Sequence, residues 1–305
     1  MDYLNYRETP VVEINHPDLD RRGVQLLLKR EDLNHKTVSG NKWWKLKYNL
    51  AEARRQNKRT LLTFGGAYSN HIYATAATAA ALGFASIGII RGEKTLPLNP
   101  TLEFATRQNM TLHYLSRDAY RQKSEPAILS ALCDQFGDFY LIPEGGTNSF
   151  AVQGTAEFGV QLLETRFDYA LLAVGTGGTL AGLIRGFQGQ RQIIGVPVFK
   201  GSGYLVDEIK SLGRGAEGQN YDNWFLWTEY HHGGYAKTSP ELLSFMKEIN
   251  YSSQVPLDHV YTGKLLYAIF REIEKGTFSK GTTLLAIHTG GLQGAKSFCD
   301  VSRLS

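Results

Sequence analysis

Short apolar segments alternate with helix-forming segments along most of the chain, and several of the junctions are glycine turns. Residues 60–64 form an apolar run that ends at Gly65-Gly66, and the alanine-rich segment 69–82 ends at Gly83. Because parallel strands need helical crossovers, this alternation predicts an α/β fold with mainly parallel sheets covered by helices. We expect strands at 24–29, 60–64, 85–90, 110–115, 139–143, 169–174, 193–199 and 283–287, and helices at 39–53, 69–82, 98–108, 151–164, 180–187, 240–249 and 263–275.

The composition is that of a soluble globular protein. The 305 residues are 42% apolar, which allows a substantial core, and the length fits one large domain or two. No run of about 18 apolar residues occurs, and the N-terminus lacks the pattern of a secretory signal, so neither a membrane span nor secretion is expected. Cys133 and Cys299 lie far apart, which indicates neither a disulfide framework nor a zinc site and favours a reducing cytoplasm.

Nucleic-acid and metal partners are not expected either. The net charge is +4, from 33 basic and 29 acidic side chains, and no basic stripe with interleaved aromatic residues occurs. The adjacent His231 and His232 would point apart on a strand, and no third ligand has a suitable spacing.

Residues 39–42 have the composition of a helix start. Ser39 and Asn41 are capping residue types, the glycine between them relaxes the entry, and apolar residues then recur at helical spacing. Lys42 therefore lies in the first turn, where the positive end of the helix dipole disfavours an ammonium group by about 0.3–1 kcal/mol. Imine chemistry requires a lysine of lowered pKa. On this segment alone, the favoured interpretation is still that Lys42, like Lys45, solvates one side of a helix.

The most specific local pattern is the turn Gly175-Thr176-Gly177-Gly178-Thr179, which joins an apolar strand to a helix start. Backbone amides in such a turn converge, and the helix dipole adds a positive potential, so the turn suits a phosphate group. The turn lacks the lysine of a nucleotide P-loop, and also the full glycine spacing and following acid of a dinucleotide fold. A tight turn without a ligand is an equally good interpretation of this segment alone.

Three further turns place polar side chains at strand ends. Ser69, Asn70 and His71 follow the first glycine turn and suit a carboxylate that must also lie near a proton acceptor. The alternatives are ordinary capping by Ser69 or Asn70 and a structural role for His71, and for His71 the structural role is favoured. The turns 261–264 and 288–291 are weak signals by themselves.

Taken in order, these turns resemble the pyridoxal-phosphate enzymes of the tryptophan synthase β fold (fold type II). Within them, the set resembles the 1-aminocyclopropane-1-carboxylate deaminases and D-cysteine desulfhydrases, and it extends from residues 29–32 to 288–291. The resemblance implies pyridoxal 5'-phosphate as cofactor and a small amino acid as substrate. It also implies these roles: catalytic, Lys42, Ser69 and Tyr261; cofactor-binding, Lys42, Asn41, Gly175, Thr176, Gly177, Gly178, Thr179, Thr289 and Tyr261; substrate-binding, Ser69, Asn70, His71 and Tyr235.

The resemblance further implies how these residues act. Lys42 would carry the cofactor covalently and, once released, take the α-proton of the substrate. Residues 175–179 would bind the phosphate through backbone amides and the two threonine hydroxyls. Residues 69–71 would hold the substrate carboxylate, with Ser69 as a candidate for proton transfer, and Tyr261 would face the cofactor ring.

The implied fold consists of two three-layer αβα domains with mainly parallel sheets. Residues 1–43 and 145–305 would form a discontinuous large cofactor-binding domain, and residues 44–144 a small inserted domain. The site would lie in the cleft between them, at the carboxyl ends of the strands. The family also implies a homodimer.

Two positions bear on the reaction. The ring-opening deaminases usually have Tyr-Glu-Gly-Lys, with the acid facing the ring nitrogen, where this chain has Thr262; Thr289 is typical of the desulfhydrases. Both features favour α,β-elimination from D-cysteine or a β-substituted alanine, which gives a 2-oxo acid and ammonia. The alternatives are a 1-aminocyclopropane-1-carboxylate deaminase producing 2-oxobutanoate, a non-catalytic binder of this fold, and a dinucleotide-dependent protein. Trp43 and Trp44, bulkier than the residues usual after the lysine, could narrow the pocket.

Overall fold

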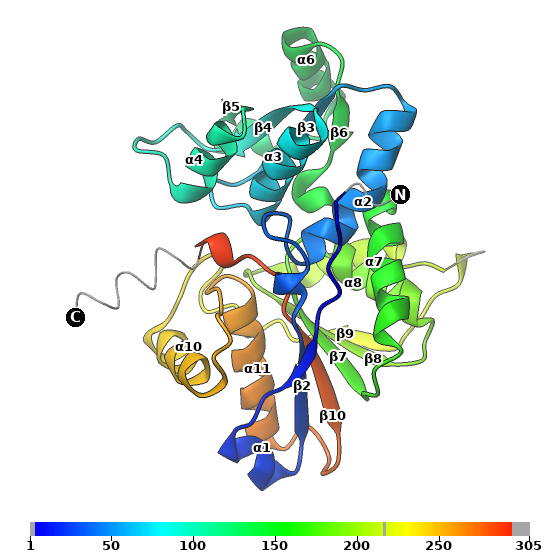
Figure 1. The fold of residues 1–305 in the computed structure, drawn as a ribbon, viewed down its shortest axis with the longest axis vertical. Coiled ribbons are helices and arrows are strands. Elements are labelled where there is room, and N and C mark those ends of the chain that lie inside the picture. Colours follow the sequence, from blue (N-terminus) through cyan, green and yellow to red (C-terminus); the bar gives the residue numbers. More distant parts are fainter. Residues whose placement is uncertain (1–3, 216–217, 295–305) are drawn as a thin grey trace.

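The computed structural model describes residues 4–215 and 218–294 and is built around two sheets (Figure 1). The polar, glycine-rich segment 213–219, which its composition predicts to be a surface loop, lies partly outside these residues. Cys299 lies wholly outside them. Within the described residues, no helix is long and apolar enough to cross a membrane.

The larger sheet has six strands in the order β1-β2-β10-β7-β8-β9. Neighbouring strands are parallel except for β1 with β2. The central strands β7 and β8 are buried along nearly their whole length, as expected for a sheet covered on both faces. The strands are β1 (Val11–Glu13), β2 (Gln25–Lys29), β7 (Tyr169–Val174), β8 (Gln192–Pro197), β9 (Trp224–Leu226) and β10 (Thr283–Ile287).

Helices cover both faces of this sheet. Because side chains alternate across a strand, Leu172 and Val174 of β7 face one core cluster with α7, α8 and α9, whereas Leu171 and Ala173 face another with α1, α10 and α11. In Figure 1, α7 and α8 lie on one side of the sheet and α10 and α11 on the other. These helices are α1 (Pro17–Arg22), α7 (Ser149–Leu162), α8 (Gly178–Phe187), α9 (Leu205–Leu212), α10 (Pro240–Ser253) and α11 (Thr262–Lys275).

The smaller sheet has four parallel strands in the order β5-β4-β3-β6. Leu62 and Phe64 of β3 pack in a core cluster with α5 and α6, and a separate cluster joins α3 and α4 to the sheet. This part is therefore also a three-layer αβα structure. Its elements are β3 (Thr60–Gly65), α3 (Asn70–Leu82), β4 (Ala85–Arg91), α4 (Pro100–Arg107), β5 (Met110–Leu115), α5 (Arg117–Arg121), α6 (Pro126–Phe136) and β6 (Tyr140–Ile142).

The helix α2 (Asn41–Arg55) runs from one sheet toward the other (Figure 1). Its Leu46 and Leu50 belong to a core cluster that includes Phe158 of α7 together with Leu61 and Ala74 of the smaller unit. This helix therefore packs on both halves of the molecule, and its first turn lies at the junction between them.

The observed architecture confirms the predicted α/β class with two αβα units of mainly parallel strands. Each strand and helix expected from the sequence is present, with ends shifted by a few residues. The sequence interpretation missed β1, β9, α1, α5, α6 and α9. These are short or weakly patterned elements; in α6, for example, only Leu132 is fully buried, so its apolar residues give little periodic signal.

The start of α2 differs from the prediction. Gly40 is the N-cap residue, and neither Ser39 nor Asn41 caps the helix with its side chain. Gly40 has φ 71° and ψ −148°, a conformation that essentially only glycine adopts. A Cβ atom there would lie 1.9 Å from the carbonyl oxygen of Thr289. The helix start is therefore fixed by close packing against the terminal glycine turn, which no local capping pattern can reveal.

Candidate active site

A cavity of about 320 Å³ lies where strands of both sheets end. Its wall includes Gly66 after β3, Arg91 at the end of β4, residues 175–179 after β7, and Thr289 after β10. Ligands of α/β proteins bind at this edge of the sheet. All residues that the sequence interpretation assigned to a site line this one cavity: Asn41, Lys42, Ser69, Asn70, His71, Gly175, Thr176, Gly177, Gly178, Thr179, Tyr235, Tyr261 and Thr289.

Lys42 lies in the first turn of α2 with its amine in the cavity. Its Nζ donates to Oδ1 of Asn41 (3.0 Å), and Nδ2 of Asn41 donates to the hydroxyl of Thr179 (2.8 Å). Burial lowers the pKa of Lys42 to about 8. The amine is therefore neutral in a sizeable fraction of molecules near neutral pH, and Asn41 connects it to the glycine turn.

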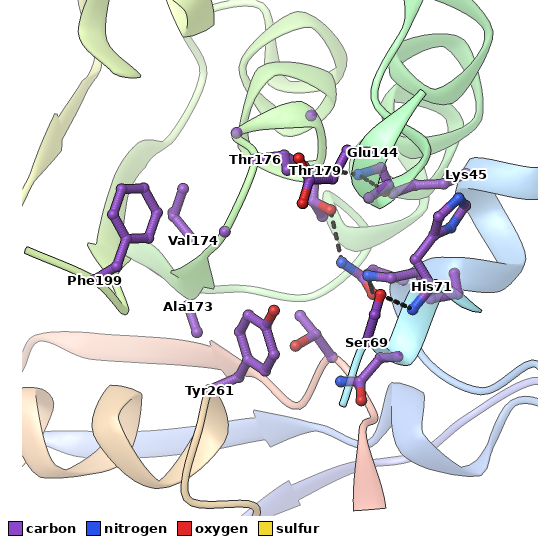
Figure 2. Close-up of a pocket in the computed structure, with 18 of the residues that line it drawn as sticks. Lys45, Ser69, His71, Glu144, Ala173, Val174, Thr176, Thr179, Phe199 and Tyr261 are labelled. Carbon is purple, nitrogen blue, oxygen red and sulfur yellow. Dashed lines mark hydrogen bonds between the residues drawn. The ribbon is translucent and has the colours of Figure 1, made fainter. Parts of the chain in front are cut away.

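A second buried amine, that of Lys45 on α2, lies beside the glycine turn. The Nζ atom of Lys45 donates to the carbonyl of Gly145 (2.5 Å) and to the hydroxyl of Thr147 (2.9 Å), and lies 3.5 Å from the hydroxyl of Thr176. Lys45 is only 2% exposed, and burial, followed by repulsion from Lys42, holds its pKa well below the usual range. The interpretation of Lys45 as a solvated surface residue is therefore wrong. Figure 2 shows its side chain pointing toward the start of α8.

Ser69 is the N-cap residue of α3, and Asn70 is the first residue of that helix. The hydroxyl oxygen of Ser69 caps α3 by accepting from the backbone N–H groups of His71 (3.2 Å) and Ile72 (3.3 Å), so the capping interpretation holds. Its own O–H remains available to a ligand in the cavity. Asn70 contacts the terminal turn, because its Oδ1 accepts from Gln293.

His71 is buried and neutral. Oγ1 of Thr63 donates to the Ile142 carbonyl (2.8 Å), so its lone pairs accept from Nε2–H of His71, 2.8 Å away. This fixes the tautomer and leaves Nδ1 as an acceptor without a partner in the described part of the chain. Burial, with help from Lys42 and Lys45, holds the pKa of the ring well below its usual range. The ring therefore has no N–H to offer a carboxylate.

Tyr235 and Tyr261 form an aromatic pair on the wall of the cavity. Their rings are nearly perpendicular, with centroids 6.1 Å apart, and the Tyr261 hydroxyl donates to that of Tyr235 (3.3 Å). Burial raises the pKa of both hydroxyls, that of Tyr261 well above its usual range. Both tyrosines are therefore neutral at physiological pH. Because Tyr261 donates its only O–H to Tyr235, it is the O–H of Tyr235 that can be donated into the cavity.

Thr262 does not contribute to the cavity wall. It is 1% exposed, and its hydroxyl donates to Oδ2 of Asp258 (2.7 Å). The Asp258 carboxylate also accepts the backbone N–H groups of Val260, Tyr261 and Thr262, so it holds the start of α11. In this chain, the residue at position 262 therefore stabilises the N-terminus of α11.

The pair Trp43-Trp44 does not narrow the cavity. Both side chains are buried in the core, and neither lines the cavity. The indole N–H of Trp43 donates to the Leu4 carbonyl (2.7 Å), and that of Trp44 to Oε2 of Glu31 (2.8 Å). The expectation that these residues shape the pocket is wrong because successive positions on a helix point away from the face that carries Lys42.

Several wall residues were missed by sequence interpretation. Lys45 could have been found, since it lies one helical turn after Lys42 and therefore on the same face. Glu144 had a weaker signal, because it lies between a strand end and the glycine pair Gly145-Gly146. No local pattern marks Arg91, Phe199 or Tyr204, although all three line the cavity.

The donors around the cavity fit a phosphorylated aldehyde. A lysine amine of lowered pKa can bind an aldehyde covalently. The turn 175–179 supplies backbone amides at the N-terminus of the ten-residue helix α8, and the buried amine of Lys45 lies beside Thr176. Among the described residues, no group of His, Cys, Asp and Glu side chains could hold a metal ion.

Comparison with known proteins agrees with this donor set. Residues 3–290 match the sequence profile of a family described as "Pyridoxal-phosphate dependent enzyme". The chain is similar to a mitochondrial bifunctional D-cysteine desulfhydrase/1-aminocyclopropane-1-carboxylate deaminase of Arabidopsis thaliana, at 32% identity over 95% of this chain and 78% of that protein. It is also similar to a D-cysteine desulfhydrase of Klebsiella pneumoniae, at 27% identity over 89% and 88% of the two chains.

A solved structure supports the same relationship. The crystal structure of a 1-aminocyclopropane-1-carboxylate deaminase homologue superimposes with a TM-score of 0.85 at 26% identity. The superposition covers 98% of this chain and 94% of the other.

Proposed function

Because the chain belongs to the pyridoxal-phosphate dependent enzyme family, we propose that it is a lyase that carries out α,β-elimination on D-cysteine or a β-substituted alanine. The products would be a 2-oxo acid, ammonia and the departed β-substituent. The observation that carries this choice is the charge of the cavity wall. Among the described residues that line the cavity, Glu144 is the one carboxylate, and Lys123 binds Glu144 at 3.1 Å. Ring opening, in the family resemblance, relies on an acid at position 262, where this chain has a buried threonine.

In this proposal, residues of the larger unit hold the cofactor, and Lys45 of α2 lies beside its phosphate. Lys42 would bind its aldehyde, and residues 175–179 would bind its phosphate through backbone amides and the hydroxyls of Thr176 and Thr179, with Lys45 as a nearby cation. Asn41, Tyr261 and Thr289 would surround the ring. Bound pyridoxal phosphate supplies an electron sink that stabilises negative charge at the α-carbon of an amino acid.

The protein itself supplies proton transfer and orientation. With a pKa of about 8, the amine of Lys42 is a suitable acceptor for the α-proton. Ser69 accepts two helix N–H bonds, so its O–H can be donated to the substrate carboxylate or leaving group. Because the ring of His71 has no free N–H, the side chains of Ser69 and Asn70 would bind the carboxylate. Tyr235 would complete the substrate wall.

A 1-aminocyclopropane-1-carboxylate deaminase is the second candidate. It is favoured by the 32% identity to a relative whose name includes both activities. An assay panel of D- and L-amino acids with 1-aminocyclopropane-1-carboxylate separates the two candidates. Sulfide and pyruvate from D-cysteine support elimination; 2-oxobutanoate from the cyclopropane without sulfide from D-cysteine supports ring opening.

The cofactor assignment of Lys42 has its own test. The purified protein should show a visible absorbance band that Lys42→Ala abolishes, together with activity. Lys47→Ala is the matched control, because Lys47 lies on the same helix but binds Glu157 (2.7 Å) outside the cavity. A colourless wild type that does not take up added cofactor would overturn the proposal.

The domain division, assembly and location are also proposals. We propose that residues 1–43 with 145–305 form the large domain and residues 44–144 the small one, in a cytoplasmic homodimer. All strands of the four-stranded sheet fall within 44–144, and all six strands of the other sheet fall outside it, which supports the division. Light scattering tests the dimer, and limited proteolysis near the proposed boundaries tests the domains.

A further inference from the structure

Lys264 is a fully buried cation that takes no part in the proposed reaction. It lies in the first turn of α11 and is 0% exposed. Its Nζ atom donates to three backbone carbonyls, those of Gly234 (2.7 Å), His231 (2.9 Å) and Val198 (3.1 Å). An ammonium group has three N–H donors, so this three-carbonyl site satisfies it completely.

The position of Lys264 is costly in two ways. Burial lowers its pKa to about 8, with Asp258 acting in the opposite direction, and the first turn of a helix is the end that disfavours a cation. Burying a charge is tolerated where fixed polar groups compensate it. The three carbonyls provide that compensation. Removing the ammonium would leave three carbonyl dipoles close together without a cation, and the carbonyls of His231 and Gly234 would keep only their backbone N–H donors.

The three-carbonyl site joins the segments that carry the aromatic wall of the cavity. Val198 directly precedes Phe199, and Gly234 directly precedes Tyr235. Lys264 itself lies three residues after Tyr261, the N-cap residue of α11. Phe199, Tyr235 and Tyr261 all line the cavity, and Figure 2 shows Phe199 and Tyr261 on the same side of it. One ammonium group therefore connects the start of α11 to two other segments of the chain, the residues after β8 and the loop 231–234, directly beside the wall.

The loop that supplies two of the carbonyls has an unusual backbone. His232 has φ 49° and Ala236 has φ 56°, so two non-glycine residues adopt the left-handed region. Such conformations cost free energy and persist only where the surrounding structure holds them. The loop's own bonds, from the Gly234 N–H to the His231 carbonyl (3.0 Å) and from the Lys237 N–H to the Gly234 carbonyl (3.2 Å), hold part of it. The bonds from Lys264 to the same two carbonyls flank His232 and add a restraint from a distant helix.

We propose that Lys264 is a positioning residue, whose ammonium group gathers the three carbonyls and thereby sets Tyr235 and Phe199 against Tyr261 as the substrate wall. The expected effect of Lys264 on substrate affinity rests on the proposed function, whereas its effect on the conformation of the loop 231–235 does not. A purely structural lysine would lower stability when replaced, without a particular effect on the loop 231–235 or on substrate affinity.

The first test uses Lys264→Met, which keeps most of the side-chain volume and removes the charge. In the apoprotein, hydrogen–deuterium exchange should rise in residues 198–199 and 231–235 and stay unchanged in β7. In the holoenzyme, KM should rise about tenfold or more, the scale of a lost charged hydrogen bond, while kcat changes less. Unchanged exchange in 231–235 would overturn the proposal, whatever the activity. If exchange in 231–235 rises in Lys264→Met but the wild-type protein has no activity on the tested amino acids, the result counts against the proposed function and not against the role of Lys264.

The second test uses Lys264→Ala, which opens space for a small cation between the carbonyls. Ammonium and methylammonium chloride should raise its melting temperature and restore KM toward the wild-type value, and tetramethylammonium at equal ionic strength should do neither, because it has no N–H donors. Lys275→Ala on the same helix is the control, since Lys275 binds Glu272 at the surface and should show no cation-specific recovery. A Lys264→Ala protein that ammonium does not recover, whether folded or not, contradicts the proposal.

Discussion

The amine of Lys42 owes its reactivity to its surroundings. Burial is the cause that lowers its pKa from 10.5 to about 8, and Asn41 accepts one of its hydrogens while donating to Thr179. A lysine with an ordinary pKa would be almost entirely protonated at neutral pH and so a poor nucleophile. The environment at the start of α2 therefore prepares this side chain before any ligand arrives.

This pKa predicts how cofactor uptake depends on pH. The rate at which the apoprotein binds pyridoxal phosphate covalently should rise with pH and level off above about pH 8, because only the neutral amine attacks the aldehyde. At pH 7 the neutral fraction is about 300-fold larger than for an unperturbed lysine. Stopped-flow absorbance measures the rate, with Lys47→Ala as control. A rate that still rises tenfold per pH unit beyond pH 9 would show that the amine is not perturbed.

At the scale of residues, sequence interpretation worked where the signal lies within a few consecutive positions. The turns that contain Lys42, Ser69 and Thr176 could be read because each combines glycine, a strand end and a helix start. The contacts of Lys45 could not, since its partners Gly145 and Thr176 lie 100 and 131 positions away. For the same reason, the buried site of Lys264 could not be predicted. Its ammonium group binds three backbone carbonyls, and no pattern of side chains in the sequence marks them.

At the scale of elements, the start of α2 is defined by contact between two turns. Gly40 donates its N–H to the Glu31 carbonyl (2.9 Å) and to Oδ1 of Asn34 (2.9 Å), and Nδ2 of Asn34 donates back to the Gly40 carbonyl (3.0 Å). On its other side, Gly40 lies against Thr289. The element was predictable from its apolar spacing, but its first residue depends on these long-range contacts, and so the capping prediction failed.

Gly40→Ala should disrupt this junction. The added Cβ would lie 1.9 Å from the Thr289 oxygen in a backbone conformation that alanine avoids, so the free energy of unfolding should fall by about 3 kcal/mol or more. Gly83→Ala is the matched control, because Gly83 also has positive φ (75°) but nothing lies within 4 Å of its Cβ position, so its cost should be about 1 kcal/mol. Urea unfolding of both variants makes the comparison. Equal losses would mean that the contact with Thr289 is unimportant.

The N-terminus of α11 supports a further prediction. Thr262→Glu would remove a donor to Asp258 and bury a second carboxylate beside it, so we expect a loss of about 2–4 kcal/mol in the free energy of unfolding. The new carboxyl would have a raised pKa in the folded state. The loss should therefore grow as pH rises from its unfolded pKa through its folded pKa.

Thr262→Val serves as the control for this variant. It removes only the hydroxyl bond and should cost about 1 kcal/mol, with little dependence on pH. Chemical denaturation between pH 4 and pH 8 measures the free energy of unfolding of both variants. A stable Thr262→Glu protein that gains 2-oxobutanoate production from 1-aminocyclopropane-1-carboxylate would show that position 262 can reach the cavity, against the structure.

At the scale of the whole molecule, the cavity lies at the edge where two separate sheets end, and α2 packs on both. Residues of the smaller unit, such as Ser69 and Arg91, and residues of the larger one, such as Thr176 and Thr289, line the same space. The strand and helix pattern could predict each sheet, because it is local. The way that the two sheets face each other follows from packing of α2 in a core cluster shared by both, which the pattern does not encode.

A ligand held at two separate points of the cavity, by Lys42 and by the turn 175–179, should stabilise the folded chain. Pyridoxal phosphate at 100 times its dissociation constant should add about 2.7 kcal/mol and raise the melting temperature by about 4 °C for a chain of this length. Pyridoxal, which lacks the phosphate, should raise the melting temperature less, because it cannot bind the turn 175–179 through a phosphate. Pyridoxal phosphate should also raise the melting temperature of Lys42→Ala less, because the covalent bond to Lys42 is lost. Differential scanning fluorimetry measures all three. Equal shifts in the three cases would show that the glycine turn and Lys42 do not act together on one ligand.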